Sequence, residues 1–401
     1  MQGEILVTEL KHKPKMPVST GDFGVEQSEA VRRFHRSFPE YAPTPLLRLK
    51  ALAKALGVRD IYVKDESKRF GLNAFKVLGG SYAIAREMAD CLGLDGDRLT
   101  FPALLEAALK ARQQLVFVTA TDGNHGRGVA WTAGRLGQKA IVYMPKGSSP
   151  ERLSNIQALG AEASITSLNY DDAVRLANLK ATEIGGVMVQ DTSWPGYEKI
   201  PRHIMQGYTT MLAETVEQLG SVVPTHVFLQ AGVGAMSGAS ASFLADYYKE
   251  RHPCVTVVEP SAADCIYRTA KADDGRLHNV SGDLDSIMVG LCCGEPCALG
   301  WAQLAAYADH FISMPDEVAA LGMRVLASPL AGDLPVTSGE SGAAGFGLAM
   351  AALMKPELGW LKKRLKLDEQ AVILCLSTEG DTDAAMYRRI VWEGAFNWQN
   401  I

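Results

Sequence analysis

Short apolar segments alternate with longer amphipathic ones along most of the chain, and this alternation constrains the fold more than any other feature. It is typical of βαβ units, which build parallel sheets covered by helices. At 401 residues the chain is longer than a usual single domain, so we expect an α/β protein with two domains. The strands are predicted at 60–64, 115–119, 139–144, 163–167, 186–190, 225–230, 254–258 and 371–376. The helices are predicted at 47–56, 76–90, 101–112, 124–136, 150–159, 170–184, 199–219, 236–251, 315–327, 341–354 and 381–394.

Composition excludes several classes of protein. The net charge of −5 provides no basic field for nucleic acid and no polybasic signal for membranes. No apolar run reaches the ~18 residues of a membrane span. The first residues lack a secretory pattern. They begin a polar and basic stretch of about 40 residues that we interpret as an arm. Seven cysteines in a chain of this length fit a reducing cytosol. We therefore expect a cytoplasmic protein without nucleic-acid or membrane partners.

The only cluster of cysteines comprises Cys292, Cys293 and Cys297. It lacks a second ligand pair at the spacing of a zinc site, so no metal is expected and the thiols are interpreted as small buried apolar groups. A redox-sensitive pair between Cys265 and either Cys292 or Cys293 stays open.

Lys76 is the first candidate for chemistry. A predicted strand and a polar loop deliver it to the expected start of a helix. There the positive end of the helix dipole would disfavour its protonated form, so we expect a depressed pKa. An unprotonated lysine is a nucleophile that commonly forms Schiff bases. The alternative is a solvated lysine in the first turn of a helix.

Two glycine-rich turns follow predicted strands and open predicted helices. Residues 120–128 form the first turn and residues 231–238 the second. Such turns direct backbone N–H groups at an anion, which suits a phosphate or a carboxylate. A dinucleotide site at the second turn is a rival interpretation, because Glu259 stands where an acid that binds ribose would be. That rival explains neither Lys76 nor the first turn.

At these residues the chain resembles the fold type II pyridoxal-phosphate enzymes, the tryptophan synthase β family. The three segments 69–76, 120–126 and 190–194 carry the resemblance, and together they look like the diaminopropionate ammonia-lyases of that family. The likeness extends from about Tyr41 to Glu393. It implies a homodimer, with the cofactor in the cleft between two domains. The large domain would comprise 1–79 and 194–401, and a small α/β domain would be inserted at 80–193.

The resemblance implies a role for each matching residue. Lys76 would carry pyridoxal 5′-phosphate, the second turn would hold the phosphate, and the first would hold the substrate carboxylate. Ser377, at the end of the last predicted strand, would bond the pyridine nitrogen. A hydroxyl cannot keep that nitrogen protonated as a carboxylate would, and the milder electron sink suits β-elimination. The cofactor-binding residues are predicted to be Lys76, Asn124, Gly232, Val233, Gly234, Ala235, Met236 and Ser377.

Asp122 decides the expected substrate. An acid beside a loop that binds a carboxylate is unfavourable, on the order of 4 kcal/mol for like charges ~4 Å apart at intermediate dielectric. Such a cost suggests that Asp122 attracts an additional substrate ammonium or acts as a base; capping of the next helix is the alternative. Asp191 is a second acid expected in the same cleft. The substrate-binding residues are predicted to be Thr121, Asp122, Gly123, Asn124, His125 and Asp191.

The activity implied is conversion of 2,3-diaminopropionate to pyruvate and two ammonia molecules. Both isomers would be substrates, with Lys76 as the base for the L form and Asp122 as the base for the D form. Asp191 is a further catalytic candidate, His125 is expected to be structural, and Glu340 is a cleft candidate of undefined role. A serine or threonine dehydratase, a cysteine-forming transferase and a non-catalytic ligand-binding protein on the same fold are the alternatives.

Overall fold

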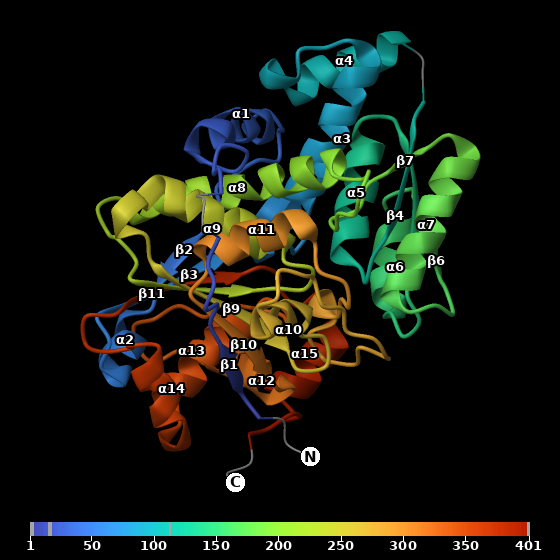
Figure 1. Cartoon of the computed structure of the whole chain (residues 1–401). Coiled ribbons are helices and arrows are strands. Elements are labelled where there is room, and N and C mark those ends of the chain that lie inside the picture. The colour runs from blue at the N-terminus through green and yellow to red at the C-terminus, as the bar shows by residue number, and fades with distance from the viewer. Residues whose placement is uncertain (1–3, 15–17, 112–113, 399–401) are drawn as a thin grey trace.

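The computed structural model describes residues 4–14, 18–111 and 114–398, and the strands of these residues form two separate sheets (Figure 1). One has seven strands in the order β1-β10-β9-β8-β11-β3-β2, and the other has four in the order β6-β5-β4-β7. The larger sheet comprises β1 (Leu6–Thr8), β2 (Leu46–Arg48), β3 (Asp60–Asp65), β8 (His226–Gln230), β9 (Cys254–Pro260), β10 (His310–Met314) and β11 (Val372–Ser377). The smaller sheet comprises β4 (Val116–Ala120), β5 (Lys139–Met144), β6 (Glu162–Ile165) and β7 (Val187–Met188).

Helices cover both sheets (Figure 1). The α-helices in the first half of the chain are α1 (Val25–Arg36), α2 (Lys50–Leu56), α3 (Val77–Leu92), α4 (Phe101–Ala111), α5 (Asn124–Arg135), α6 (Pro150–Gln157), α7 (Tyr170–Ile184) and α8 (Lys199–Leu219). The others are α9 (Ala235–Tyr248), α10 (Cys265–Ala272), α11 (Ala298–Tyr307), α12 (Asp316–Ala327), α13 (Ala344–Met354), α14 (Gly359–Arg364) and α15 (Ala384–Val391). Short 3-10 helices are η1 (Glu66–Gly71), η2 (Gly96–Arg98), η3 (Lys249–Arg251), η4 (Val289–Leu291) and η5 (Pro356–Leu358).

The larger sheet is parallel in its interior and antiparallel at both edges, where β1 pairs with β10 and β2 with β3. Its two faces support separate cores, because successive side chains of a strand point to opposite faces. In β11, Leu374 and Leu376 pack in the core that includes residues of α8 and α9, whereas Ile373 and Cys375 pack in the core built by α12 and α13. The predicted α/β class with mixed, helix-flanked sheets is confirmed.

The predicted strands are all present, with bounds shifted by a few residues. Strands β1, β2 and β10 were not predicted, and neither were helices α1, α10, α11 and α14. The interpretation of the first 40 residues as an arm is wrong. Helix α1 buries Val31 and Phe34 completely and packs against α8. Arg33 and Arg36 lie on its exposed face, and their charge conceals the apolar stripe in a composition count.

The smaller sheet, from Val116 to Met188, lies within the segment predicted to be an inserted domain. Helix α3 spans the expected boundary at residue 80 and contacts both α5 and α8. The domain boundaries therefore stay a prediction. Within the described residues, no helix combines the length and the apolar character that crossing a membrane requires.

Candidate active site

A cavity lies at the carboxyl ends of the neighbouring strands β8 and β11, the edge at which open α/β sheets bind ligands. It encloses about 570 Å³ of empty space, mouth included, which is the size of a small-molecule site. Its lining residues are Phe75, Lys76, Asn124, Asp191, Tyr208, Gln230, Ala231, Gly232, Val233, Gly234, Ala235, Met236, Ser237, Gly290, Leu291, Cys293, Ser341, Thr378 and Glu379.

Lys76 immediately precedes helix α3 and reaches into this cavity. Its Nζ atom lies 2.9 Å from Oδ2 of Asp191. Burial is the largest single influence and acts to lower the pKa of Lys76, but Asp191 and the other acidic groups nearby together outweigh it, so that pKa lies above the usual value. The expected depression of the pKa is therefore wrong for the free lysine, because acidic groups surround it and the foremost of them, Asp191, lies 115 residues away in the sequence. Burial acts to raise the pKa of Asp191, yet the Lys76 ammonium, His125 and a backbone hydrogen bond together outweigh it and lower that pKa to about 2.

The first glycine-rich turn leaves strand β4 and opens helix α5. The hydroxyl of Thr121 accepts a hydrogen bond from the backbone N–H of Gly123, and Gly123 has φ of 155°. Asn124 lines the cavity and donates its side-chain amide to Glu379. No side chain caps helix α5, so the capping alternative for Asp122 is wrong.

Asp122 is buried, and its Oδ2 atom lies 3.3 Å from Nη1 of Arg152, which is also buried. It lies in the wall of a neighbouring cavity that also includes Tyr170 and Cys292. Gly290 separates the two spaces, because a Cβ atom added there would lie 3.5 Å from Oδ2 of Asp122. Arg152 was missed in the sequence, and its guanidinium offsets the unfavourable charge that the sequence predicted for this loop.

His125 is buried beneath the same turn. Its Nε2 atom lies 2.8 Å from the carbonyl oxygen of Val189, so this nitrogen donates, while Nδ1 has no partner. Burial lowers the pKa of His125, which favours the neutral ring. The bond to the backbone is consistent with the structural role expected for this residue.

The second glycine-rich turn brings Gly232 to Met236 to the cavity wall at the start of helix α9. Gly234 adopts φ of 90°, which favours glycine. A Cβ atom on Gly232 would come within 3.1 Å of Sγ of Cys293. The turn therefore leaves room for an anion against backbone N–H groups at the positive end of a long helix.

The rival dinucleotide interpretation is wrong. The carboxylate of Glu259 is fully buried and accepts the backbone N–H groups of Ile266 and Tyr267 at 2.9 and 2.6 Å. It holds helix α10 in place and has no access to a ribose.

Ser377 is not on the cavity wall. Its hydroxyl donates to Ser338 at 2.8 Å, and the hydroxyl that lines the cavity at this strand end is that of Thr378. The reason is the alternation of side chains along β11: Ser377 continues the face of Cys375, and Thr378 continues the face of Leu376. That Ser377 bonds the cofactor ring therefore stays a prediction, and Thr378 is a second candidate for this contact.

Two polar atoms of the cavity have no partner among the residues that the structure describes. The hydroxyl of Tyr208 and Oε1 of Gln230 are buried and unpaired, although both residues line the cavity. Buried polar groups are nearly always hydrogen-bonded, so unpaired ones at a cavity indicate a ligand or water. Together with Lys76 and the anion cradle, they fit pyridoxal phosphate. Among the described residues, no group of three or more His, Cys, Asp or Glu could hold a metal ion.

Glu340 does not line the cavity, although its neighbour Ser341 does. Its carboxyl group is buried, and Oε1 has no partner. Burial, reinforced by the nearby charge of Glu379, raises the pKa of Glu340 to about 8. Glu340 is therefore a buried acid beside the site with few hydrogen-bond partners.

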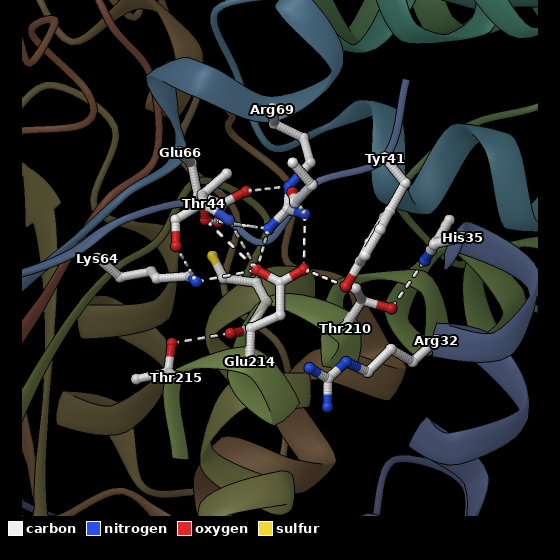
Figure 2. A network of polar contacts seen from close by, with 12 residues as sticks. Arg32, His35, Tyr41, Thr44, Lys64, Glu66, Arg69, Thr210, Glu214 and Thr215 are labelled. Carbon is white, nitrogen blue, oxygen red and sulfur yellow. Dashed lines mark hydrogen bonds and ion pairs between the residues drawn. The ribbon is translucent and has the colours of Figure 1, made fainter. Parts of the chain in front are cut away.

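A network of buried charges anchors the loop that leads to Lys76, and we call it the loop network (Figure 2). Both Nη atoms of Arg69 donate hydrogen bonds to the Glu214 carboxylate at 2.7 Å. Nζ of Lys64 donates to Oε2 of the same carboxylate at 2.9 Å. Glu66 bonds Arg69 at 2.8 Å and accepts the hydroxyl of Thr44 at 2.6 Å. Sequence reasoning did not identify this network, because Glu214 lies in a helix 145 residues after Arg69.

Comparison with known proteins places the geometry in context. The model of the family "Pyridoxal-phosphate dependent enzyme" matches residues 38–378. The diaminopropionate ammonia-lyase of Escherichia coli K12 is 51% identical over 374 residues, which are 93% of each chain. A crystal structure of the Escherichia coli enzyme in complex with D-serine matches with a TM-score of 0.92, 48% identity and 98% coverage of each chain. A second one, in complex with an aminoacrylate-PLP azomethine reaction intermediate, matches with a TM-score of 0.90, 47% identity and 98% coverage of each chain.

Proposed function

The chain belongs to the family of pyridoxal-phosphate dependent enzymes, and we propose that it is a diaminopropionate ammonia-lyase. It converts 2,3-diaminopropionate and one water to pyruvate and two ammonia molecules. The observation that carries the proposal is the pairing of Lys76 with Asp191 in a cavity that Asp122 borders across Gly290. Lys76 and Asp191 thus line the cavity itself, and the carboxylate of Asp122 lies in the wall of the neighbouring cavity.

Pyridoxal phosphate, when bound, supplies the electron sink for removal of the Cα proton and loss of the β-amino group. Lys76 is the residue that would hold it covalently. The turn from Gly232 to Met236 would receive its phosphate, and Thr378 and Asn124 would face its ring. Tyr208 and Gln230 would find partners for polar atoms that the chain itself leaves unpaired.

The acids would select the substrate. Covalent use of Lys76 removes the ammonium that Asp191 contacts at 2.9 Å, which leaves this carboxylate free for an ammonium of the substrate. A diamino acid offers a second ammonium, whereas serine and threonine offer a neutral hydroxyl. Burial makes the difference large, because an unpaired carboxylate in a dry site is costly.

Lys76 and Asp122 would accept the Cα proton from opposite faces of the substrate. In the two isomers the Cα–H bond points to opposite faces if the carboxylate and the amine keep their places. Lys76 would serve the L form and Asp122 the D form, while the neutral ring of His125 would support the turn between them. The D-serine complex of the Escherichia coli relative supports a site that accepts a D-amino acid.

Two further features belong to the proposal. We expect a homodimer, as the family resemblance implies. We also expect a cytoplasmic location, which the seven cysteines support because none forms a disulfide.

The test is a substrate panel on the purified holoenzyme, with pyruvate and ammonia measured for both isomers of diaminopropionate, for serine and for threonine. We expect two ammonia molecules per pyruvate from diaminopropionate and kcat/KM far above that for either hydroxyl substrate. Comparable kcat/KM for serine would make the protein a dehydratase. A protein that binds these amino acids without releasing pyruvate would be a non-catalytic member of the fold.

A further inference from the structure

Arg152 has contacts that a merely structural arginine would not need. It lies in helix α6, beside the smaller sheet, yet its guanidinium lies 3.3 Å from Asp122 and donates to the hydroxyl of Thr382 at 3.2 Å. Thr382 follows the last strand of the larger sheet. The side chain of Arg152 therefore bridges the first glycine-rich turn to the opposite wall of the cleft.

The stem of Arg152 is also fitted to that turn. A Cβ atom on Gly123 would lie 2.9 Å from Cδ of Arg152, so only glycine leaves room for the stem. Both residues are buried, so little of either side chain is exposed to solvent. The geometry fixes the carboxylate of Asp122 in place from one side.

We propose that Arg152 is the positioning residue that holds the carboxyl group of Asp122 oriented for proton removal from the D isomer. The inference rests on the proposed function. It concerns the D isomer alone, because the base proposed for the L isomer, Lys76, is held by Asp191 and not by Arg152.

The charges around this pair explain why an arginine is needed. The acids Asp122, Glu379, Glu340 and Asp383 all raise the pKa of Arg152, against the effect of burial. A guanidinium stays protonated in such surroundings and offers two donors in a fixed plane. Without it, the buried carboxyl group of Asp122 would lose its main compensating charge. The other titratable groups that act electrostatically on Asp122 are Lys76, His125, Tyr170, Cys292 and Cys293.

The decisive experiment compares both isomers in Arg152→Met, Arg152→Lys and Thr382→Val, with Arg324→Met as control. Arg324 donates to the backbone carbonyls of Ile390 and Ala395, remote from the cleft. For Arg152→Met we expect kcat/KM for the D isomer to fall roughly 10²-fold through displacement of the base. The acid limb of its pH profile should move to higher pH. The profile for the L isomer should keep its position.

Arg152→Lys retains the positive charge but not the planar pair of N–H donors. The acid limb of the pH profile for the D isomer should therefore return toward the wild-type position, while part of the loss in kcat/KM remains. Thr382→Val removes the second contact and should lower D turnover less than Arg152→Met. The control Arg324→Met should change neither the ratio of kcat/KM for the D and L isomers nor the acid limb of the pH profile. Urea unfolding of each apoprotein gives a readout that is independent of turnover and identifies any variant that fails to fold.

A double-mutant cycle separates this inference from the function on which it rests. If Arg152 acts through Asp122, Arg152→Met should not alter the D/L ratio further in an Asp122→Asn background. Equal losses for both isomers with an unmoved acid limb, or full additivity in the cycle, would overturn the role of Arg152 while leaving the lyase activity intact. Wild-type protein that turns over neither isomer would overturn the proposed function and this inference with it.

Discussion

Two buried clusters of charge are tied to the loop that carries Lys76, and they differ in how completely they are paired. In the loop network (Thr44, Lys64, Glu66, Arg69 and Glu214), no buried side-chain nitrogen or oxygen lacks a partner (Figure 2). The cleft contains Lys76, Asp122, Arg152 and Asp191. Unpaired atoms gather in and beside it: Nε of Arg152, Nδ1 of His125, the hydroxyl of Tyr208 and, next to the cavity, Oε1 of Glu340.

Burial of charge alone therefore does not mark a functional site. A network in which every buried polar atom is paired pays a desolvation penalty, but it fixes a single geometry. A loop that positions a reactive lysine needs such a fixed geometry. An open cluster keeps polar atoms available for a ligand. Mutations in the two clusters should therefore have different effects. In the loop network they should lower the free energy of unfolding, and in the cleft they should lower the rate of turnover.

The largest effect is expected for Lys76→Ala. The variant should lose turnover of both isomers, and the purified protein should lose the visible absorption band of a lysine-bound cofactor. Borohydride reduction followed by peptide mass spectrometry locates the attachment in the wild type. Lys68→Ala, in the same loop but exposed, is the matched control and should keep both properties. Reduced cofactor on another lysine would remove Lys76 from the centre of the site.

The next largest effect is expected for Asp122→Asn. Asparagine keeps the shape of the side chain but cannot accept a proton at neutral pH, and loss of a positioned base costs roughly 10²–10⁴-fold in rate. We expect that loss in kcat for the D isomer and a much smaller one for the L isomer, measured side by side on one preparation. Equal losses would point to Asp122 as the counter-charge of an ammonium, and full D activity would transfer the role of base to Asp191.

These two residues also show how far the sequence leads. Lys76 and Asp122 lie in short motifs whose turns and helix starts are local, so their places at the cleft were predictable. The pKa of Lys76 was not, because it depends on Asp191, and no spacing connects Arg152 to Asp122, which lies 30 residues away. Such pairs arise only when separate βα units meet at one edge of a sheet.

The fold shows the same limit. Continuous apolar runs such as Val227 to Leu229 in strand β8 identify buried strands, whereas strands β1 and β2 are three-residue edges. Ser377 and Thr378 are adjacent in the sequence, but successive positions of a strand point to opposite faces. Only the packing of β11 between two cores decides which hydroxyl lines the cavity.

In the loop network, Glu214→Gln should act on stability. Removing one charge from a buried group of this kind typically costs about 3–5 kcal/mol, and Arg69 and Lys64 would lose their common partner. Urea unfolding should show this loss, while the folded variant keeps the D/L ratio of the wild type. Glu217→Gln, on the same helix but paired with Arg32 at the surface, should cost less than about 1 kcal/mol. A changed D/L ratio in Glu214→Gln would break the distinction between the two clusters.

The smallest effect, and one of opposite sign, is expected for Glu340→Gln. The pKa of Glu340 is raised to about 8 by burial and by Glu379, so between about pH 4.5 and pH 8 the folded chain binds a proton that the unfolded chain has released. Its contribution to the free energy of unfolding therefore decreases as pH rises through this window. Glutamine cannot ionise, and the variant should gain stability relative to the wild type as pH rises, by roughly 1–3 kcal/mol at pH 8 and less at pH 5. Urea unfolding across this range, with exposed Glu369→Gln as control, measures the difference. A constant difference at all pH values would mean that Glu340 keeps its charge state on folding. A loss of stability that grows with pH would make it a paired acid like Glu214, and the contrast between a closed and an open cluster would not extend to this side of the cleft.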